Sequence, residues 1–288
     1  MKPIWLASLS FLLVCGCDRP LAVVAPAQTS GKTQISTFLP DDMSNSPRFS
    51  VRGKVIWKGE PPVVPKLPAI FGKVEKHIPP FNPFFPRIDE KTKGLANAVV
   101  SIDLSERGRP ELQPKNLTLI AEPNRFYFEP GRQPIVATTL GSELEMKSVS
   151  DKPSIITARG AAFYSLTFPT PETVHRKKLE QAGQVNFYNS GGEFSQRYCW
   201  AGCRAYVFDH PWFAVTDDQG NFEIKNIPLG KHEIVVDVAD YRMEKYEQDP
   251  DTQLITRILY KSPVQKLTKI SVNRNQEVQF EVGNGDFR

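Results

Sequence analysis

The chain has 288 residues, of which 40% are hydrophobic and 24% charged, and its formal net charge is +4. These values are ordinary for a globular protein and allow one or two domains. The small net charge is spread along the chain, which argues against nucleic-acid binding, because that function needs a clustered basic face. Proline (25 residues) exceeds glycine (18 residues), and this composition favours strands and loops over long helices.

The N-terminus has the pattern of an export signal. Lys2 provides a positive charge, and the apolar run 4–14 is too short to span a membrane. The small residues before Cys17 are similar to a bacterial lipobox, in which the cysteine is lipidated and becomes the first residue. We therefore expect residues 1–17 to be a lipoprotein signal peptide and Cys17 to anchor the protein in the cell envelope, facing the periplasm or the exterior. The alternative is an ordinary secretory signal, cleaved after residues 25–27.

Export changes the meaning of the four cysteines. Cys15 leaves with the signal and Cys17 carries the lipid, so that Cys199 and Cys203 remain. In an exported protein this pair favours a disulfide. Its short spacing requires a tight turn that brings the two α-carbons within about 7 Å. A metal-binding or redox-active pair is the alternative.

The first part of the mature chain has no sustained periodicity. Residues 18–48 are rich in Pro, Ser, Thr, Ala and Gln, and they predict a flexible tether. Order is expected from Phe49, because apolar residues alternate with charged ones from there to Trp57. The many prolines of 61–86 exclude helix and interior strand, and predict a long loop packed on the body by its phenylalanines.

Short strand patterns, separated by Pro, Gly, Asn and Asp, fill the rest and predict an antiparallel sandwich. The expected strands include 98–104, 117–121, 125–129, 135–139, 143–149, 155–158, 162–168, 185–188, 205–209, 257–260, 267–272 and 278–282. Only 172–182 has a helical pattern, and 239–256 is polar and expected to be a loop.

The most informative pattern lies between residues 209 and 230. Asp217-Asp218-Gln219-Gly220 separates two strand patterns and is typical of a turn whose glycine has a positive φ. Phe222 and Ile224 alternate with polar residues, which gives the second strand one apolar face. The two aspartates also suggest calcium, but the stretch lacks the further oxygen ligands that this ion needs, and the turn accounts for both.

The stretch 209–230, with its Thr216-Asp-Asp-Gln-Gly220 hairpin, resembles a bacterial periplasmic family. Its members are similar to a cupredoxin-like sandwich joined to a carboxypeptidase-regulatory-like (transthyretin-like) module, and some are called methylamine-utilisation-protein-like. The segments Gly53–Gly59 and Leu95–Ile102 fit the same pattern. The resemblance implies an all-β fold: an antiparallel, cupredoxin-like β-sandwich with a transthyretin-like (prealbumin-like) β-sandwich module.

The resemblance leaves two domain organisations open. In the simpler one, residues 49–210 form the cupredoxin-like sandwich and residues 211–288 form the regulatory-like module. In the other, residues 50–104 and 211–282 form one module that the cupredoxin-like strands interrupt.

A cupredoxin fold implies type 1 copper, which needs two imidazoles and a thiolate, usually with a weak axial thioether. In the family, the last loop carries Cys, His and Met at three-residue steps, but the loop 197–204 has no histidine or methionine. The earlier ligand loop, 148–158, also lacks histidine. We therefore expect no bound metal and no cofactor, with a Cys199–Cys203 disulfide in place of the metal as the clamp of the last loop.

The four histidines stand elsewhere. His77 lies in the proline-rich loop and His175 on the expected helix. His210 is expected to make a structural hydrogen bond at a strand junction. His232 is expected to face solvent from a strand.

No catalytic motif is present: the chain has no Gly-x-Ser-x-Gly elbow, no phosphate loop and no His-Glu-x-x-His pair. The sequence therefore predicts a non-enzymatic, lipid-anchored envelope protein that binds or scaffolds a partner and has a degenerate copper site. The expected partners are the membrane, through the lipid, and an envelope protein or glycan, but no nucleic acid.

Two other functions remain open. One is that of a periplasmic copper electron-transfer protein. The other is that of a carbohydrate-binding accessory protein, in which aromatic residues would line a groove. The candidate aromatic residues are Trp200, Tyr206, Phe208, Trp212 and Phe213, although strand alternation places most of them in the core.

Overall fold

The structure is a computed structural model that describes residues 47–64, 82–103, 111–191, 200–251 and 255–287. All of them belong to the second of two compact units, Asp42–Arg288. The expected signal peptide, Cys17, nearly all of the tether, His77 and Cys199 lie outside the described residues. Within the described part, no helix is long and apolar enough to cross a membrane.

The described residues form β-strands and one short 3₁₀ turn, η2 (Asn284–Asp286), so the expected all-β fold is confirmed. One group of strands comprises β1 (Arg48–Lys58), β2 (Val99–Asp103), β12 (Phe213–Val215), β13 (Asn221–Pro228), β14 (Gly230–Val238), β17 (Val264–Val272) and β18 (Gln276–Gly283). A second group comprises β3 (Asn116–Glu122), β4 (Arg125–Glu129), β5 (Ile135–Thr139), β6 (Glu143–Ser148), β7 (Ser154–Gly160), β8 (Tyr164–Phe168), β9 (Val174–Lys178), β10 (Gly183–Gly191) and β11 (Gly202–Phe208). The remaining strands, β15 (Met243–Gln248) and β16 (Ile255–Tyr260), pair with each other.

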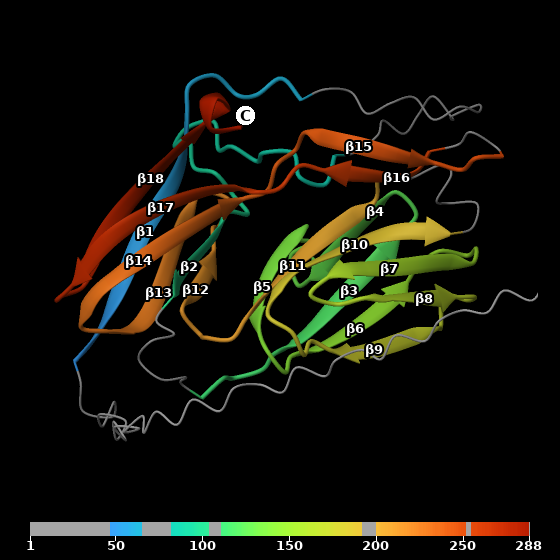
Figure 1. Cartoon of the computed structure of the whole chain (residues 1–288), viewed down its shortest axis with the longest axis horizontal. Helices are drawn as coiled ribbons and strands as arrows, with labels where there is room; N and C mark the ends of the chain where they lie inside the picture. Colours follow the sequence, from blue (N-terminus) through green and yellow to red (C-terminus); the bar gives the residue numbers. More distant parts are fainter. Residues whose placement is uncertain (1–46, 65–81, 104–110, 192–199, 252–254, 288) are drawn as a thin grey trace, which may run out of the picture. The chain divides into compact units, whose positions relative to one another are not determined.

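The first group builds a sandwich that we call the terminal sandwich. One sheet has the order β13-β1-β18 and the other the order β12-β2-β14-β17. Strand β1 pairs antiparallel with β13 and parallel with β18, so segments from both ends of the described chain lie side by side (Figure 1). The expected apolar face of β1 is confirmed, because Val51, Val55 and Trp57 are buried in the core between the two sheets.

The second group builds the central sandwich, whose strands lie between β2 and β12 in the sequence. Its sheets have the orders β4-β3-β6-β9 and β5-β11-β10-β7-β8. Two pairings are parallel, β3 with β6 and β11 with β5. Aliphatic and aromatic side chains fill the core between the sheets, among them Leu119, Phe128, Met146 and Phe187.

Strand β11 is buried on both faces. Cys203, Ala205 and Val207 belong to the core of the central sandwich, whereas Tyr206 belongs to the core of the terminal sandwich. The face of β11 that carries Tyr206 is thus covered by residues outside the central sandwich. Near Tyr206 the same face carries Arg204, a buried charge.

The expected helix at 172–182 is wrong. Residues 174–178 form β9, an edge strand that pairs antiparallel with β6. An isolated helix of this length is marginal in water, whereas β6 offers a complete row of backbone partners and the core buries Leu179 just beyond β9.

The expected loop at 239–256 is also partly strand. Residues 243–248 form β15, which pairs with β16 as a two-stranded ribbon (Figure 1). The side chains of β15 are almost all exposed, so this strand lacks the apolar alternation on which the sequence-based expectation depends.

Candidate functional site

The loop between β6 and β7 is where the resemblance places the first copper-ligating imidazole, and here it is a serine network. Ser148, Ser150 and Ser154 are buried. The Ser154 hydroxyl donates to Ser148 Oγ at 3.0 Å, and the Ser150 hydroxyl donates to the Lys152 carbonyl at 2.9 Å. These hydroxyls hold the loop closed by hydrogen bonds among themselves and with the backbone.

The family's other copper ligands lie in the last loop, which in this chain is the connection from β10 to β11. Cys199 lies outside the described residues, so the expected Cys199–Cys203 disulfide stays a prediction. Cys203 has no disulfide partner among the described residues and lies at the start of β11, buried in the core of the central sandwich. Burial raises the pKa of this thiol well above its ordinary value, which disfavours the thiolate that a metal or an oxidant needs.

The three described histidines are separate and each has a structural contact. His175 lies on β9, not on a helix, and its Nε2 donates to the Thr167 carbonyl at 2.9 Å. His232 is buried, so the expectation that it faces solvent is wrong. It shares the inward face of β14 with Ile234, and its Nε2 donates to the Pro228 carbonyl at 2.7 Å.

His210 makes the structural hydrogen bond expected for it. Its Nδ1 accepts from the backbone N–H of Trp212 at 3.3 Å, and its ring lies among Phe208, Trp212 and Phe213. This bond requires a neutral Nδ1. Burial lowers the pKa of His210, although the nearby carboxylates of Asp103 and Asp209 oppose the shift.

We expect His210 to make stability depend on pH. Its pKa in the folded chain lies below the ordinary value of 6.5, so the unfolded chain binds more protons in this window and stability falls as pH falls through it. Urea denaturation at pH 7.5 and pH 5 should show a larger loss for the wild type than for His210→Gln. Equal losses in the two proteins would contradict the assignment.

The donor set of the described residues does not fit a type 1 copper centre, which needs two imidazoles and a thiolate. Across the described ranges, no group of three or more His, Cys, Asp or Glu side chains could hold a metal ion. The loop that should present an imidazole presents serine hydroxyls, which are poor ligands for copper.

The acidic hairpin at 217–220 is a structural turn. Asp217 Oδ1 accepts from the backbone N–H groups of Gln219 (2.9 Å) and Asn221 (2.8 Å), and Oδ2 accepts from the Asn221 side chain (3.1 Å). Gly220 has the expected positive φ of 80°. Asp218 instead forms an ion pair with Arg87. Both carboxylates therefore have protein partners, which argues against calcium at this turn.

Substituting Asp217 with alanine should destabilise the protein by about 1–2 kcal/mol, since the carboxylate satisfies two backbone N–H groups of the turn. The control Asp218→Ala removes only an exposed ion pair, and should change stability by about 0–1 kcal/mol. Urea denaturation of both variants would measure this difference. An Asp218→Ala effect as large as that of Asp217→Ala would show that the hydrogen bonds are not the cause.

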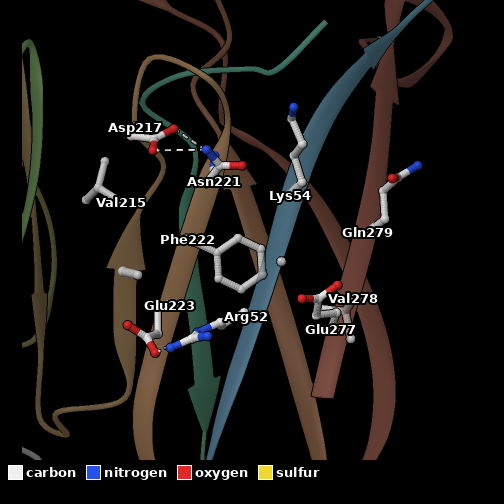
Figure 2. Close-up of a pocket in the computed structure, with 12 residues that line it drawn as sticks. Arg52, Lys54, Val215, Asp217, Asn221, Phe222, Glu223, Glu277, Val278 and Gln279 are labelled. Carbon is white, nitrogen blue, oxygen red and sulfur yellow. Dashed lines mark hydrogen bonds and ion pairs between the residues drawn. The ribbon is translucent and has the colours of Figure 1, made fainter. Parts of the chain in front are cut away.

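A hollow with a volume of about 820 Å³ lies over β1, β12, β13 and β18. Figure 2 shows its lining, in which the Arg52 guanidinium turns toward Glu223 and the Asp217 carboxylate toward Asn221. Arg52 Nε lies 2.9 Å from Glu223 Oε1, and this interaction holds the pKa of Glu223 below its ordinary value. The lining contains no His, Cys, Ser or Thr, so it lacks the Ser–His or Cys–His pair of a hydrolase-type site. Its charged and amide side chains can contact a polar ligand.

The aromatic residues considered for carbohydrate binding are mostly core residues, as expected from alternation. Trp200, Tyr206 and Trp212 are buried. Phe208 and Phe213 stack on each other with ring centroids 4.7 Å apart. These side chains thus pack mainly against protein.

Comparison with known proteins adds little to this site. A scan against protein-family models and a search of curated proteins each find no match. Solved structures similar to this chain include a purple cupredoxin from Nitrosopumilus maritimus (14% identity, 32% of this chain and 98% of that chain, TM-score 0.24). A mutant fern plastocyanin (15%, 32% and 99%, TM-score 0.25) and a Cu(I) amicyanin mutant (11%, 39% and 99%, TM-score 0.24) are also similar.

The low identities and TM-scores carry no conclusion about activity. The fold is described from the order and direction of the strands. The central sandwich has two sheets of four and five strands, with β3 parallel to β6 and β5 parallel to β11. This arrangement is cupredoxin-like, as the resemblance implied. Function has to be argued from the residues present.

Proposed function

We propose that this chain is a non-enzymatic, lipid-anchored envelope protein that binds or scaffolds a partner, built on a cupredoxin-like sandwich with a degenerate copper site. The observation that carries the proposal is the buried serine network of the β6–β7 loop. Ser148 and Ser154 are hydrogen-bonded to each other where an imidazole ligand is expected. The sandwich thus serves as a rigid body rather than as an electron carrier.

Copper titration tests the loss of the metal site. The purified full chain is expected to bind less than one copper per chain and to lack the strong visible absorption of a type 1 centre. The alternative, a periplasmic electron-transfer protein, requires one coloured copper per chain. That result would overturn the proposal and would place the ligands outside the described residues.

The lipid anchor is tested at Cys17, the cysteine of the lipobox-like sequence. Cells expressing the Cys17→Ala variant and fed labelled palmitate should yield an unlabelled protein that is absent from the washed membrane fraction. Cys15→Ala is the matched control, because Cys15 is removed with the signal, and it should remain labelled. A Cys17→Ala protein that stays labelled would remove the anchor from the proposal.

We also infer that the terminal sandwich is the carboxypeptidase-regulatory-like module, nested around the central sandwich. The pairing of β1 with both β13 and β18 supports the nested organisation. The partner is an envelope protein or a glycan. Crosslinking in intact cells should yield a repeatable complex, and a chain that stays uncrosslinked across several reagents would contradict a scaffolding role.

A further inference from the structure

A small cavity lies where β10 and β11 of the central sandwich meet β16. Its volume is about 110 Å³, and its walls include Phe84, Phe187, Trp200 and Ile258. A space of this size can accept a small molecule or one chemical group of a larger one.

Three arginines line this cavity, and its lining contains no acidic side chain. Arg159 Nη1 donates to the carbonyls of Ala158 (2.8 Å) and Tyr164 (3.3 Å). Arg257 Nη1 donates to the Tyr188 hydroxyl at 3.1 Å. These bonds fix two guanidinium groups beside the cavity, whose lining carries positive side chains and no negative ones.

Among the described residues, Arg257 is the only one of these arginines that forms an ion pair with a carboxylate at close range. Arg257 Nη1 lies 3.4 Å from Glu247 Oε2, in a partly exposed pair. Asp237 is close enough to Arg204 for an electrostatic interaction, but its Oδ1 accepts from Gln265 Nε2 at 2.8 Å. Neither acid belongs to the lining of the cavity.

Arg204 is the most informative of the three. Its side chain is only 4% exposed, although a buried guanidinium normally needs an anionic partner to offset its desolvation. Nε donates to Asn186 Oδ1 at 2.6 Å, and Cζ lies 4.6 Å from the centre of the Phe84 ring. Nη1 is buried and makes no hydrogen bond to a described residue. The Tyr206 hydroxyl lies close enough to interact with this guanidinium, but it too is buried without a hydrogen bond. A buried, charged donor without an acceptor is rare in folded proteins.

We propose that this cavity is an anion-binding site, in which Arg204 takes one oxyanion group, a carboxylate or a phosphate. A guanidinium presents N–H donors in a fork that matches either group. The aromatic and aliphatic walls favour a ligand whose anionic end enters first and whose remainder is short or apolar. Bound there, the anion would supply the acceptor that Nη1 lacks and would balance the positive lining.

Calorimetric titration of the full chain with sodium acetate and with inorganic phosphate tests the site, with sodium chloride at equal ionic strength as the reference. We expect one saturable site for at least one of the two anions, and the preferred anion identifies the class of ligand. Arg204→Met removes a charge-assisted hydrogen bond to the anion and should weaken binding about 10-fold to 150-fold.

Two further variants keep the test decisive if Arg204→Met folds poorly. Arg257→Met removes a partly exposed charge from the lining and should weaken binding while the protein stays folded. Arg52→Met removes an exposed arginine outside the cavity and should leave binding unchanged. The proposal is overturned if neither anion binds more tightly than chloride, or if Arg257→Met and Arg52→Met both bind as the wild type does.

Discussion

Substituting Gly94 with alanine is expected to destabilise the protein by about 3 kcal/mol, at the upper end of the usual range for overpacking. A Cβ atom at Gly94 would lie 1.7 Å from the Gln219 carbonyl oxygen and 2.8 Å from the Gly220 backbone nitrogen. Both obstacles are backbone atoms of the acidic hairpin, and that hairpin is held in place because Val55 N–H donates to the Gly220 carbonyl. Neither the backbone at Gly94 nor the hairpin can move away without breaking the contact between the hairpin and β1.

The matched control is Gly285→Ala. Gly285 lies in η2, where a Cβ atom would meet nothing within 4 Å. Urea denaturation followed by circular dichroism should give a midpoint near that of the wild type for Gly285→Ala and a clearly lower one for Gly94→Ala. Equal midpoints would mean that the close approach of the two glycines is not required by the fold.

The second large effect is expected from Phe128→Ala, which should destabilise the central sandwich by about 3–5 kcal/mol. Phe128 is fully buried in the central core, and its ring meets Phe187 edge-on at 6.0 Å. Removing the ring leaves a cavity that rigid strands on both sides cannot close. Phe163→Ala is the control, since Phe163 is 78% exposed and contacts Arg159; the expected loss is under about 1 kcal/mol.

Two probes locate the effect of Phe128→Ala. Trp57 and Trp212 lie in the core of the terminal sandwich, and Trp200 lies in a small cluster with Ile255 and Ile258. Tryptophan fluorescence therefore reports mainly on residues outside the core of the central sandwich. Circular dichroism reports on the strands of both sandwiches. Because β11 contributes to both cores, we expect fluorescence and dichroism midpoints to fall together. A fluorescence midpoint that stays at the wild-type value would show that the two sandwiches unfold independently.

Local patterns in the sequence predicted much of the local structure. The alternation of β1 identified its buried face, and Asp217 and Gly220 identified the hairpin. These features depend on the side-chain period of a strand and on the φ that a turn requires, and both are written in neighbouring residues. The same period applied to β14 would also have shown that His232 is buried, because it lies two positions from Ile234.

The candidate site was predicted less completely. The absence of histidine from the loop 148–158 was visible in the sequence, but the hydrogen-bonded serines that replace it were not. Arg204 gave no signal either, because a lone arginine in a strand pattern is most often exposed. Its burial arises only because residues far away in the sequence, Phe84 and those of β16, cover that face of β11.

The sequence by itself therefore determined the class of this protein: short strands, their inward faces, the turn at 217–220 and the lack of imidazoles where copper would need them. The tertiary structure alone decided which strands are neighbours. In the tertiary structure β18 pairs with β1, β9 pairs with β6 as an edge strand, and the charged side chain of Arg204 is enclosed between β11 and β16. The reason is physical: period and turn geometry are local, whereas partner choice and burial depend on contacts between residues that are distant in the chain.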